Sequence, residues 1–570
     1  MLCELNTPRG ETLTDTPWTA YPRPRMRRDS YVNLNGAWDF AVGEPTFGER
    51  KILVPFCPES RLSGLGEHFP EGTQLWYRRS FTLPEDFCRG RVLLHFGAAD
   101  QTAEVFLNGD RVGIHEGGYL PFSWDITHAL QQENVLTVCC RDDLRDSSFP
   151  YGKQVMARGG MWYTPVSGIW QTVWLESVPE TYIRELRVEN RGFAVTIDIG
   201  AHLPGRVLVE GLGEFPLSDG KVTIAPENPH LWSPEDPFLY NFTLEAGEDR
   251  VESYFAIRSL EVKTLGDYPR LCLNGKPYFF HGLLDQGYWP EGIYTPPAPE
   301  SYADDILAMK KLGFNTLRKH IKVEPEEFYF QCDKLGMVVW QDMVNNGDYS
   351  FFRDTALPTV GIQRLKDKSL HPDPLCRRRF LENMEGTVRL LGSHPCICLW
   401  TIFNEGWGQF DSEAVCKRLL ELDDTRFVDA ASGWFRQEGD LLDSRHVYFR
   451  KVRLQADGKK PLILSEFGGK TLKVGGHSFN PDKSYGYGSC HSLEELNEAF
   501  RQLYLQEVLP CVERGLCAAV YTQLSDVEDE VNGLVTYDRK IEKMQPELLR
   551  PLARQLPPPE KEAEFGRTDV

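Results

Sequence analysis

Residues 301–320, SYADDILAMKKLGFNTLRKH, decide the fold class of this 570-residue chain. The segment 301–313 has the apolar spacing of a helix, and Gly313 stands where a helix C-terminal cap is expected. The segment that follows, FNTLRKH, is typical of a short strand. A helix that passes directly into an apolar strand indicates an α/β fold with parallel strands.

The same alternation continues on both sides of this segment. Two more helices are expected, one over 324–336 that Gly336 closes and one before Gly392 with apolar residues of 380–391 on one face. The remaining expected strands are 278–284, 337–343, 397–405, 426–432, 446–449, 461–467 and 518–524. Eight strands in about 280 residues match the size of a (β/α)8 barrel, although the helices after the fifth and sixth strands are poorly marked.

Two all-β regions precede the barrel. Residues 1–175 contain short alternating segments such as 91–100 and 134–143, and Asn108-Gly109 is a strong hairpin signal, so this region is predicted to be a β-sandwich. Residues 176–264 hold about seven further short strands, the length of one immunoglobulin-like domain. The barrel is then expected to occupy 265–570.

Composition excludes several function classes. Lys and Arg number 63 against 83 Asp and Glu, and the resulting net charge of −20 argues against a general nucleic-acid or anionic-membrane surface. No run of 18 apolar residues predicts a membrane span, and the N-terminal sequence lacks a signal-peptide pattern. The 14 cysteines are scattered without metal-binding spacing. We therefore expect reduced thiols, a cytoplasmic location and no metal ligands among the cysteines, and the sequence leaves a structural metal ion elsewhere open.

Two glutamates end apolar barrel strands. Glu405 closes the strand 397–405 and Glu466 stands near the end of the strand 461–467. Catalytic groups of (β/α)8 barrels lie at the carboxyl ends of the strands, so the two side chains should face each other across the barrel mouth. Paired carboxylates are what glycoside hydrolysis requires, because one attacks the anomeric carbon and the other protonates the leaving oxygen.

The residues around these glutamates resemble glycoside hydrolase family 2. Residues 393–405, SHPCICLWTIFNE, look like the acid/base signature of that family, and LILSEFGG at 462–469 resembles its nucleophile strand. The order of jelly-roll sandwich, immunoglobulin-like domain and barrel also fits, over roughly residues 15–550. The resemblance implies a retaining, exo-acting β-glycosidase without a cofactor, in which Glu405 is the acid/base, Asn404 contacts the sugar 2-hydroxyl and Glu466 is the nucleophile. It leaves a homo-oligomer open.

The second barrel strand departs from the family pattern, which usually has Asn-x-x-Arg-x-Ser-His-Tyr-Pro. This chain has NTLRKHIK at 315–322, so Arg318 and His320 align with residues that line the site, but the Tyr-Pro is missing. Lys319 and Lys322 are new. The departure leaves the identity of the sugar open, although it does not affect the reaction class.

Further site residues follow other strands. Tyr448 fits a family tyrosine that often hydrogen-bonds the nucleophile, or it is a packing residue, and His446 ends the same strand. Asp342 is either a sugar ligand or, as we favour, an ion-pair partner of Arg318. Trp434 follows a barrel strand and could stack on a sugar face or anchor its loop.

Cations near the strand ends bear on the choice of sugar. Lys319, Lys322 and Lys470 are expected on the active face of an otherwise acidic chain, which favours a carboxylate-bearing sugar, a β-galacturonide or β-glucuronide. A neutral β-galactoside stays an alternative, because these cations could instead neutralise acidic groups of the site. Family 2 β-glucuronidases carry an Asn-x-Lys motif after the nucleophile, whereas 532–534 here is Asn-Gly-Leu.

Two other classes of protein remain as alternatives. An inactive carbohydrate-binding scaffold would not need both glutamates. A metal-dependent barrel hydrolase would need clustered ligands, for which His281, His320 and His446 are the candidates near strand ends.

Overall fold

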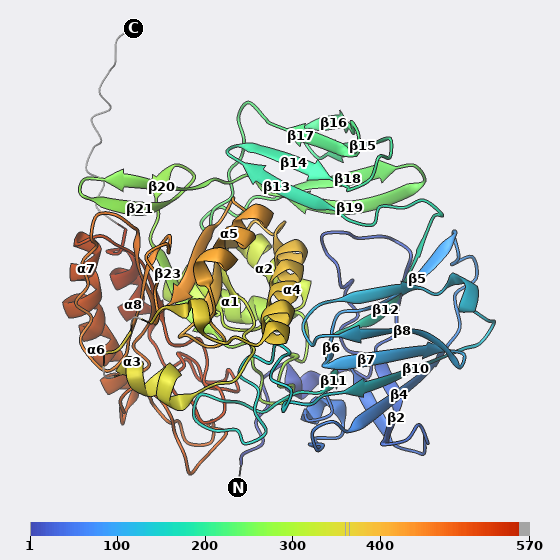
Figure 1. The fold of residues 1–570 in the computed structure, drawn as a ribbon, viewed down its shortest axis with the longest axis horizontal. Helices are drawn as coiled ribbons and strands as arrows, with labels where there is room; N and C mark the ends of the chain where they lie inside the picture. The colour runs from blue at the N-terminus through green and yellow to red at the C-terminus, as the bar shows by residue number, and fades with distance from the viewer. Residues whose placement is uncertain (1, 360, 364, 558–570) are drawn as a thin grey trace.

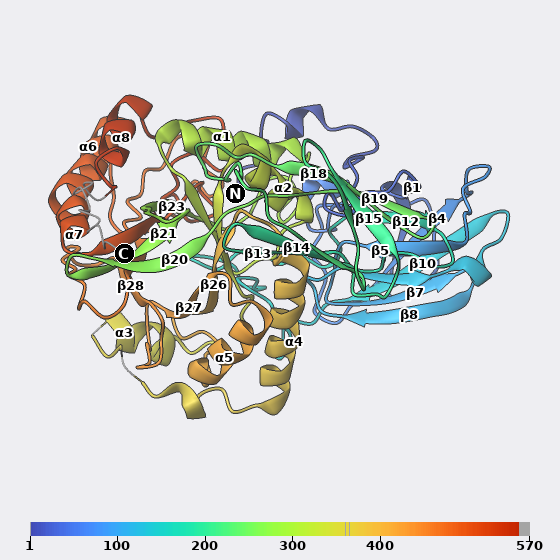
Figure 2. The ribbon, with the colours of Figure 1, turned by 90° about the horizontal axis from the view of Figure 1, so that it is seen from above.

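The computed structural model describes residues 2–359, 361–363 and 365–557. It contains an N-terminal β-sandwich, an immunoglobulin-like β-sandwich and a C-terminal (β/α)8 barrel, which confirms the predicted fold class. The N-terminal sandwich lies beside the barrel, and the second sandwich packs against both (Figures 1 and 2).

The N-terminal sandwich consists of two antiparallel sheets around one core. One sheet has the strand order β1 (Tyr31–Asn33), β12 (Val173–Val178), β5 (Arg91–Phe96), β9 (Phe122–Asp125). The other has the order β3 (Lys51–Val54), β2 (Gly36–Val42), β4 (Gln74–Phe81), β10 (Asn134–Arg141), β7 (Thr102–Leu107), β8 (Asp110–Glu116), and β6 (Ala99–Asp100) pairs with β11 (Gly168–Ile169). The predicted hairpin turn joins β7 to β8, with Asn108 at φ +55° and Gly109 at φ +92°.

The second sandwich has seven strands in two sheets. Their orders are β13 (Arg187–Arg191), β14 (Ala194–Asp198), β17 (Lys221–Ile224) and β16 (Gly213–Pro216), β15 (Gly205–Val209), β18 (Tyr240–Ala246), β19 (Asp249–Phe255). A three-stranded antiparallel sheet of β20 (Leu260–Leu265), β21 (Tyr268–Leu273) and β22 (Lys276–Pro277) then leads into the barrel.

Eight parallel strands form the barrel. In sheet order they are β27 (Phe427–Ser432), β26 (Ile397–Asn404), β25 (Val338–Asp342), β24 (Thr316–Lys319), β23 (Phe280–Asp285), β30 (Leu516–Tyr521), β29 (Leu462–Phe467) and β28 (Asp443–Val447). No ladder pair joins β27 to β28 among the described residues, but side chains connect them: Ser444 Oγ donates to Asp429 at 2.7 Å and lies 3.3 Å from Ser432 Oγ.

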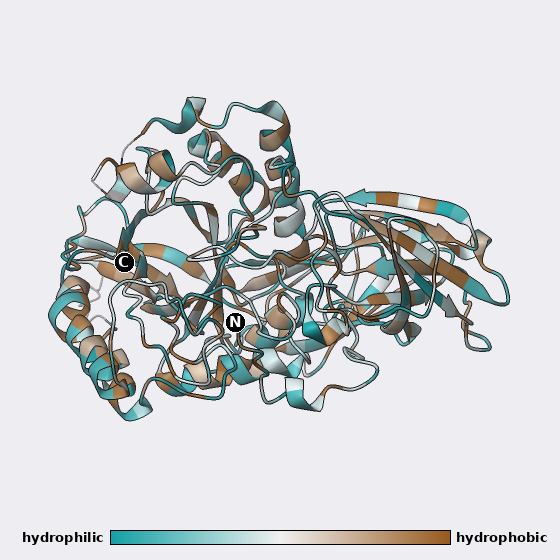
Figure 3. Cartoon of the chain, turned by 90° about the horizontal axis from the view of Figure 1, so that it is seen from below, coloured by the Kyte–Doolittle hydropathy of each residue, from teal (hydrophilic) through white to brown (hydrophobic). Residues whose placement is uncertain are grey.

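Helices cover the outside of the barrel. They are α1 (Glu300–Leu312), α2 (Glu326–Leu335), α3 (Leu357–Thr359), α4 (Pro374–Leu391), α5 (Ser412–Leu422), α6 (Leu493–Leu503), α7 (Leu509–Glu513) and α8 (Pro546–Ala553), with π-helical turns at Phe351–Ala356 and Tyr504–Val508. Hydrophobic and hydrophilic residues alternate along them (Figure 3), as expected for helices with one face on the barrel and one in solvent.

Two of the three glycines that were expected to end helices adopt the left-handed conformation of a helix cap. Gly313 and Gly336 follow α1 and α2 in the left-handed conformation, at φ +98° and +72°. Gly392 follows α4 but stays right-handed at φ −60°. The poorly marked helices are not formed: the described residues 433–442 and 448–461, after β27 and β28, contain no α-helix.

The described part of the chain contains no helix that is both long and apolar enough to cross a bilayer.

Candidate active site

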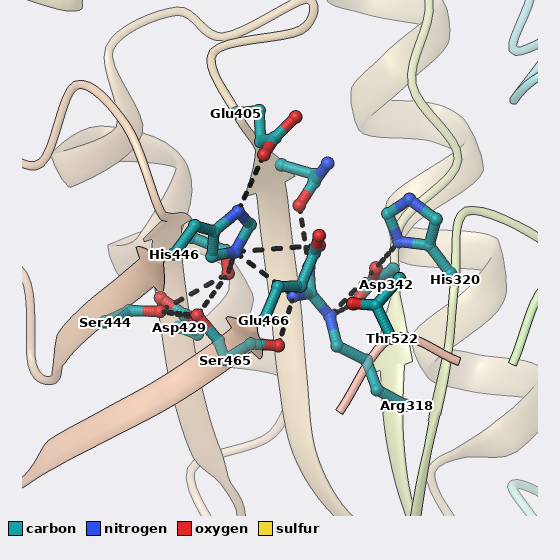
Figure 4. Close-up of polar contacts among 12 residues, drawn as sticks. Arg318, His320, Asp342, Glu405, Asp429, Ser444, His446, Ser465, Glu466 and Thr522 are labelled. Atoms are coloured by element: carbon teal, nitrogen blue, oxygen red, sulfur yellow. Dashed lines mark hydrogen bonds and ion pairs between the residues drawn. The ribbon is translucent and has the colours of Figure 1, made fainter. Parts of the chain in front are cut away.

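Polar side chains from the ends of five barrel strands meet at one point of the barrel mouth (Figure 4). Each stands at or just after the carboxyl end of an otherwise buried apolar strand, as the barrel topology requires. They are Arg318 of β24, Asp342 of β25, Asn404 and Glu405 at β26, His446 of β28 and Glu466 of β29.

Arg318 is the centre of this network and is fully buried. Its Nε donates to Asp342 Oδ1 at 2.9 Å, and its Nη1 donates to Glu466 Oε1 at 3.0 Å. Its Nη2 donates to Asn404 Oδ1 at 2.9 Å. One guanidinium therefore fixes side chains from three other strands, which a lysine with its single nitrogen could not do.

Glu466 is held in its ionised form. Burial by itself would raise the pKa of Glu466, but His446, Arg318 and a hydrogen bond from the Tyr448 hydroxyl together lower it to about 2. The carboxylate is only 4% exposed, so the neighbouring positive and donor groups act on it with little screening by water. An ionised, buried carboxylate at a strand end has the state that a nucleophile needs.

Glu405 differs from Glu466 in its surroundings. It stands in a left-handed backbone conformation, φ +52°, directly after β26, and its carboxylate Oε1 lies 2.8 Å from His446 Nδ1. The other ring nitrogen of His446 lies 3.6 Å from Glu466 Oε1. Ligand atoms of these three residues all lie within 4.8 Å of one another. This separation is shorter than the roughly 6.5–9.5 Å between the carboxyl groups of inverting glycosidases, so it fits the spacing of retaining glycosidases.

The other expected residues of the barrel mouth lie around this pair. His320 Nδ1 lies 2.7 Å from Asp342 Oδ2, so Asp342 is a partner of both His320 and Arg318. Tyr448 donates to Glu466 and lies 3.0 Å from the hydroxyl of Thr522. The ring of Trp434 is 5.6 Å from that of His446.

Three buried donors of the mouth have no protein partner in the described residues. They are Asn404 Nδ2, Trp407 Nε1 and Trp434 Nε1. Because a buried unpaired donor is costly, all three are available to a polar ligand such as a sugar hydroxyl.

Of the three lysines expected at the barrel mouth, Lys319 and Lys322 are paired with buried carboxylates instead. Lys319 is 1% exposed and pairs with Asp285 at 2.6 Å and Glu324 at 2.9 Å. Lys322 also pairs with Glu324, at 2.9 Å, and donates to the carbonyls of Gly287 and Tyr294. The prediction that these two cations face the substrate is wrong, because buried carboxylates that the sequence pattern did not reveal neutralise them.

Lys470 is half-buried and follows β29. Its backbone N–H donates to the Tyr521 hydroxyl at 3.2 Å, and its Nζ packs beside Gly488, 2.8 Å from where a Cβ would lie there. No ion pair or side-chain hydrogen bond of Lys470 occurs in the described residues. A role in binding substrate stays a prediction for this residue.

A loop of the N-terminal sandwich completes the site, and the sequence analysis missed it. Trp162 stacks on Trp407, two residues after Glu405, with ring centroids 5.2 Å apart. Tyr163 donates to Glu530, and Thr164 N–H donates to Glu528 at 2.9 Å. These residues lie more than 200 positions from Glu405 in the sequence and carry no motif, so only the packing of the two domains could reveal them.

The histidine cluster expected for a metal-dependent hydrolase is not formed in the described residues. His281 is buried between Gly313 O at 3.0 Å and Tyr504 OH at 2.8 Å, and His320 is paired with Asp342. Glu405, His446 and Glu466 are close enough to share an ion. However, the guanidinium of Arg318 stands 3.0 Å from Glu466 and would repel a metal cation there.

Models of one enzyme family match most of the chain. The model described as "Glycosyl hydrolases family 2, TIM barrel domain" matches residues 267–550, "Glycosyl hydrolases family 2" matches 184–258, and "Glycosyl hydrolase 2 galactose-binding domain-like" matches 67–157. The chain belongs to glycoside hydrolase family 2.

Individual family 2 proteins are only distantly similar. A β-galactosidase of Thermoanaerobacter pseudethanolicus is 24% identical over 489 residues, which cover 80% of this chain and 60% of that protein. This chain spans between 54% and 60% of the length of several curated relatives. A β-D-glucuronidase structure from Dictyoglomus thermophilum (TM-score 0.71, 19% identity) covers 94% of this chain and 98% of its own. A galacturonate-bound β-galacturonidase from Eisenbergiella tayi (TM-score 0.67, 18% identity) covers 94% and 99%.

Proposed function

We propose that this family 2 chain is a retaining, exo-acting β-glycosidase that hydrolyses terminal β-hexuronides. The observation that carries the proposal is the pair Glu405 and Glu466, whose carboxylate oxygens lie within 4.8 Å across the barrel mouth. Their unequal surroundings support unequal roles, because only Glu466 has a buried guanidinium and a phenol hydroxyl as partners.

In the first step, a carboxylate oxygen of Glu466 bonds to the anomeric carbon while the bond to the leaving oxygen breaks. Glu405 in its acid form transfers its proton to that oxygen, and the aglycone departs as an alcohol. Asn404, held by Arg318 at 2.9 Å, directs its free Nδ2 donor toward the sugar, where it would bind the 2-hydroxyl.

In the second step, Glu405 is a carboxylate and takes a proton from water. The water oxygen bonds to the anomeric carbon, and Glu466 leaves as a free carboxylate. Two inversions at the same carbon give retention of the β configuration. The lowered pKa of Glu466 serves both steps, because a stable carboxylate is both the attacking group and a good leaving group.

The choice of hexuronide rests on the cation of Lys470 near the barrel mouth, which is unpaired in the described residues. It also rests on the glucuronidases and the galacturonidase among the similar structures. A neutral β-galactoside is the second candidate, favoured by the similarity to a β-galactosidase over 80% of this chain. An inactive scaffold is the third, and the intact carboxylate pair argues against it.

Turnover of p-nitrophenyl β-glucuronide, β-galacturonide and β-galactoside tests these candidates together. We expect hydrolysis of a uronide by the wild type, loss of at least 10⁴-fold in Glu466→Gln, and full activity in the control Glu421→Gln on the exposed part of α5. The first product anomer, followed by NMR, should be β. No turnover of any glycoside would support the scaffold, and an initial α anomer would exclude the retaining mechanism.

A further inference from the structure

A cation of the N-terminal sandwich faces the catalytic mouth without an ion-pair partner. Lys153 is 7% exposed, and its ammonium lies 5.7 Å from the ring centre of Trp407 and 5.4 Å from that of Tyr163. Among the described residues its Nζ forms no hydrogen bond and no ion pair. The charge of Lys153 acts on the buried carboxyl of Glu530, whose pKa burial raises and Lys153 lowers, but the two groups form no ion pair in the described residues. A buried ammonium without a directly bonded carboxylate or carbonyl is costly.

The position of Lys153 is fixed by backbone contacts. Its carbonyl accepts from Tyr163 N–H at 3.0 Å, and the preceding Gly152 N–H donates to Asn345 O of the barrel at 3.5 Å. Tyr163 is itself anchored to Glu530. The backbone of Lys153 is therefore held at the boundary between the sandwich and the barrel, and its side chain is buried there against Trp407 and Tyr163.

Lys153 lies beside the part of the barrel mouth that Trp407 and His320 form. The rings of these two residues are 6.4 Å apart. Burial, and after it the charge of Lys153, lowers the pKa of His320 to about 4, so the ammonium is within electrostatic range of the ring. His320 is joined through Asp342 and Arg318 to Glu466. A sugar bound at the two glutamates would thus have Lys153 along one edge.

Apart from Lys470, the other expected or neighbouring cations of the mouth are already paired with carboxylates. Arg318 and Lys319 each contact two carboxylates, and Lys322 contacts one. Arg158, from the same sandwich loop as Lys153, pairs with Glu528 and Asp529 at 3.2 Å.

We infer that Lys153 binds the carboxylate of the terminal hexuronide, so that the N-terminal sandwich selects the charge of the sugar whose bond the barrel cleaves. This inference rests on the proposed function. The uronate carboxylate supplies the anionic partner that the ammonium lacks, and the aromatic rings of Trp407 and Tyr163 exclude water from the pair, which strengthens it.

The test compares kcat/KM on p-nitrophenyl β-glucuronide, β-galacturonide and β-galactoside for the wild type and four substitutions. Lys153→Gln should lower kcat/KM on the preferred uronide by roughly 10- to 100-fold, the worth of a charge-assisted hydrogen bond, and lower the uronide-to-galactoside ratio at least tenfold. Lys153→Arg should keep most of that ratio. Lys470→Gln represents the competing cation, and Lys417→Gln on the exposed face of α5 is the surface control.

A binding measurement on the wild type covers the case in which Lys153→Gln does not fold. Free galacturonate or glucuronate should inhibit the wild type at least tenfold more tightly than galactose or glucose. Equal inhibition by acid and neutral sugar, equal loss on uronide and galactoside in Lys153→Gln, or a ratio that falls only in Lys470→Gln would overturn the inference. Failure of the proposed function looks different, because the wild type would then turn over neither uronide, whether or not it cleaved the galactoside.

Discussion

Removing one hydroxyl from Tyr448 tests how the nucleophile is kept ionised. Its phenol donates to Glu466 Oε2, lies 3.0 Å from Thr522 Oγ1, and stacks on Tyr487 with ring centroids 3.9 Å apart. Tyr448→Phe keeps the ring and its stacking and deletes only the donor. The backbone and the volume of the site should therefore stay unchanged, so an effect on activity can be assigned to the lost hydrogen bond.

The expected magnitude follows from the charge of the acceptor. A hydrogen bond to a buried carboxylate contributes roughly 1.5–3 kcal/mol, which corresponds to about one to two pKa units. The pKa of Glu466, about 2 in the wild type, should then rise to about 3–4 in Tyr448→Phe. Activity requires the carboxylate, so it is lost as the pH falls through this pKa. The acid limb of the rate profile should move upward by about one to two pH units, whereas kcat/KM at pH 6 should change little, because Glu466 stays ionised there in both proteins.

The assay is kcat/KM on a p-nitrophenyl glycoside between pH 2.5 and 8, with folding monitored at each pH by tryptophan fluorescence. Tyr487→Phe is the matched control, because it removes a hydroxyl from the neighbouring ring of the stack. The reasoning is refuted if the acid limb of Tyr448→Phe coincides with that of the wild type.

Three further predictions concern the buried charge of Lys319, the titration of Glu59 and the leaving group of the substrate. Lys319→Met should destabilise the fold by about 3–5 kcal/mol in urea unfolding, because it leaves the carboxylate of Asp285 without its ion pair and removes one of the two ammonium partners of Glu324, whereas Lys334→Met on the exposed side of α2 should change little. Burial raises the pKa of Glu59 from 4.5 to about 7, so the folded chain keeps a proton that the unfolded chain releases, and stability falls as the pH rises between these values. Relative to wild type, Glu59→Gln should therefore gain about 2–3 kcal/mol between pH 5 and pH 8, and a constant difference would contradict this. Glu405→Gln should lose at least roughly 100-fold more kcat/KM on a methyl glycoside than on a p-nitrophenyl glycoside, whose leaving group needs no proton; equal losses would contradict the acid role.

The sequence was sufficient to predict the barrel and the main residues of its mouth. Parallel strands that are buried on both faces appear as continuous apolar runs, so a polar residue at the end of such a run is conspicuous, as with Glu405 after β26. Because parallel strands all end at the same rim, polar residues from distant segments could be placed together without knowing any contact. The network around Arg318 follows from this rule.

The same rule failed for Lys319. A place at the end of a strand fixes the position of the Cα atom, but it does not fix where the ammonium at the end of the side chain lies. Lys319 immediately follows Arg318, and adjacent residues of a strand point to opposite faces. Arg318 points into the barrel and contacts Glu466, whereas Lys319 contacts Glu324 in the loop before α2. Periodicity alone would have separated the two residues, but the loop carboxylate that neutralises Lys319 has no sequence signal.

Because the protein as a whole is acidic, binding of an anionic sugar depends on cations close to the catalytic mouth. A chain of net charge −20 repels an anionic sugar at long range, and Glu405 and Glu466 add to this at the mouth itself. Arg318 cannot offset this for the substrate, because its guanidinium is already shared by Asp342 and Glu466. Lys153 on the sandwich loop, whose ammonium forms no ion pair in the described residues, is in a position to supply an additional cation. In the binding mode that we infer, the contact between the two domains selects the sugar on which the carboxylate pair acts, as well as stabilising the fold.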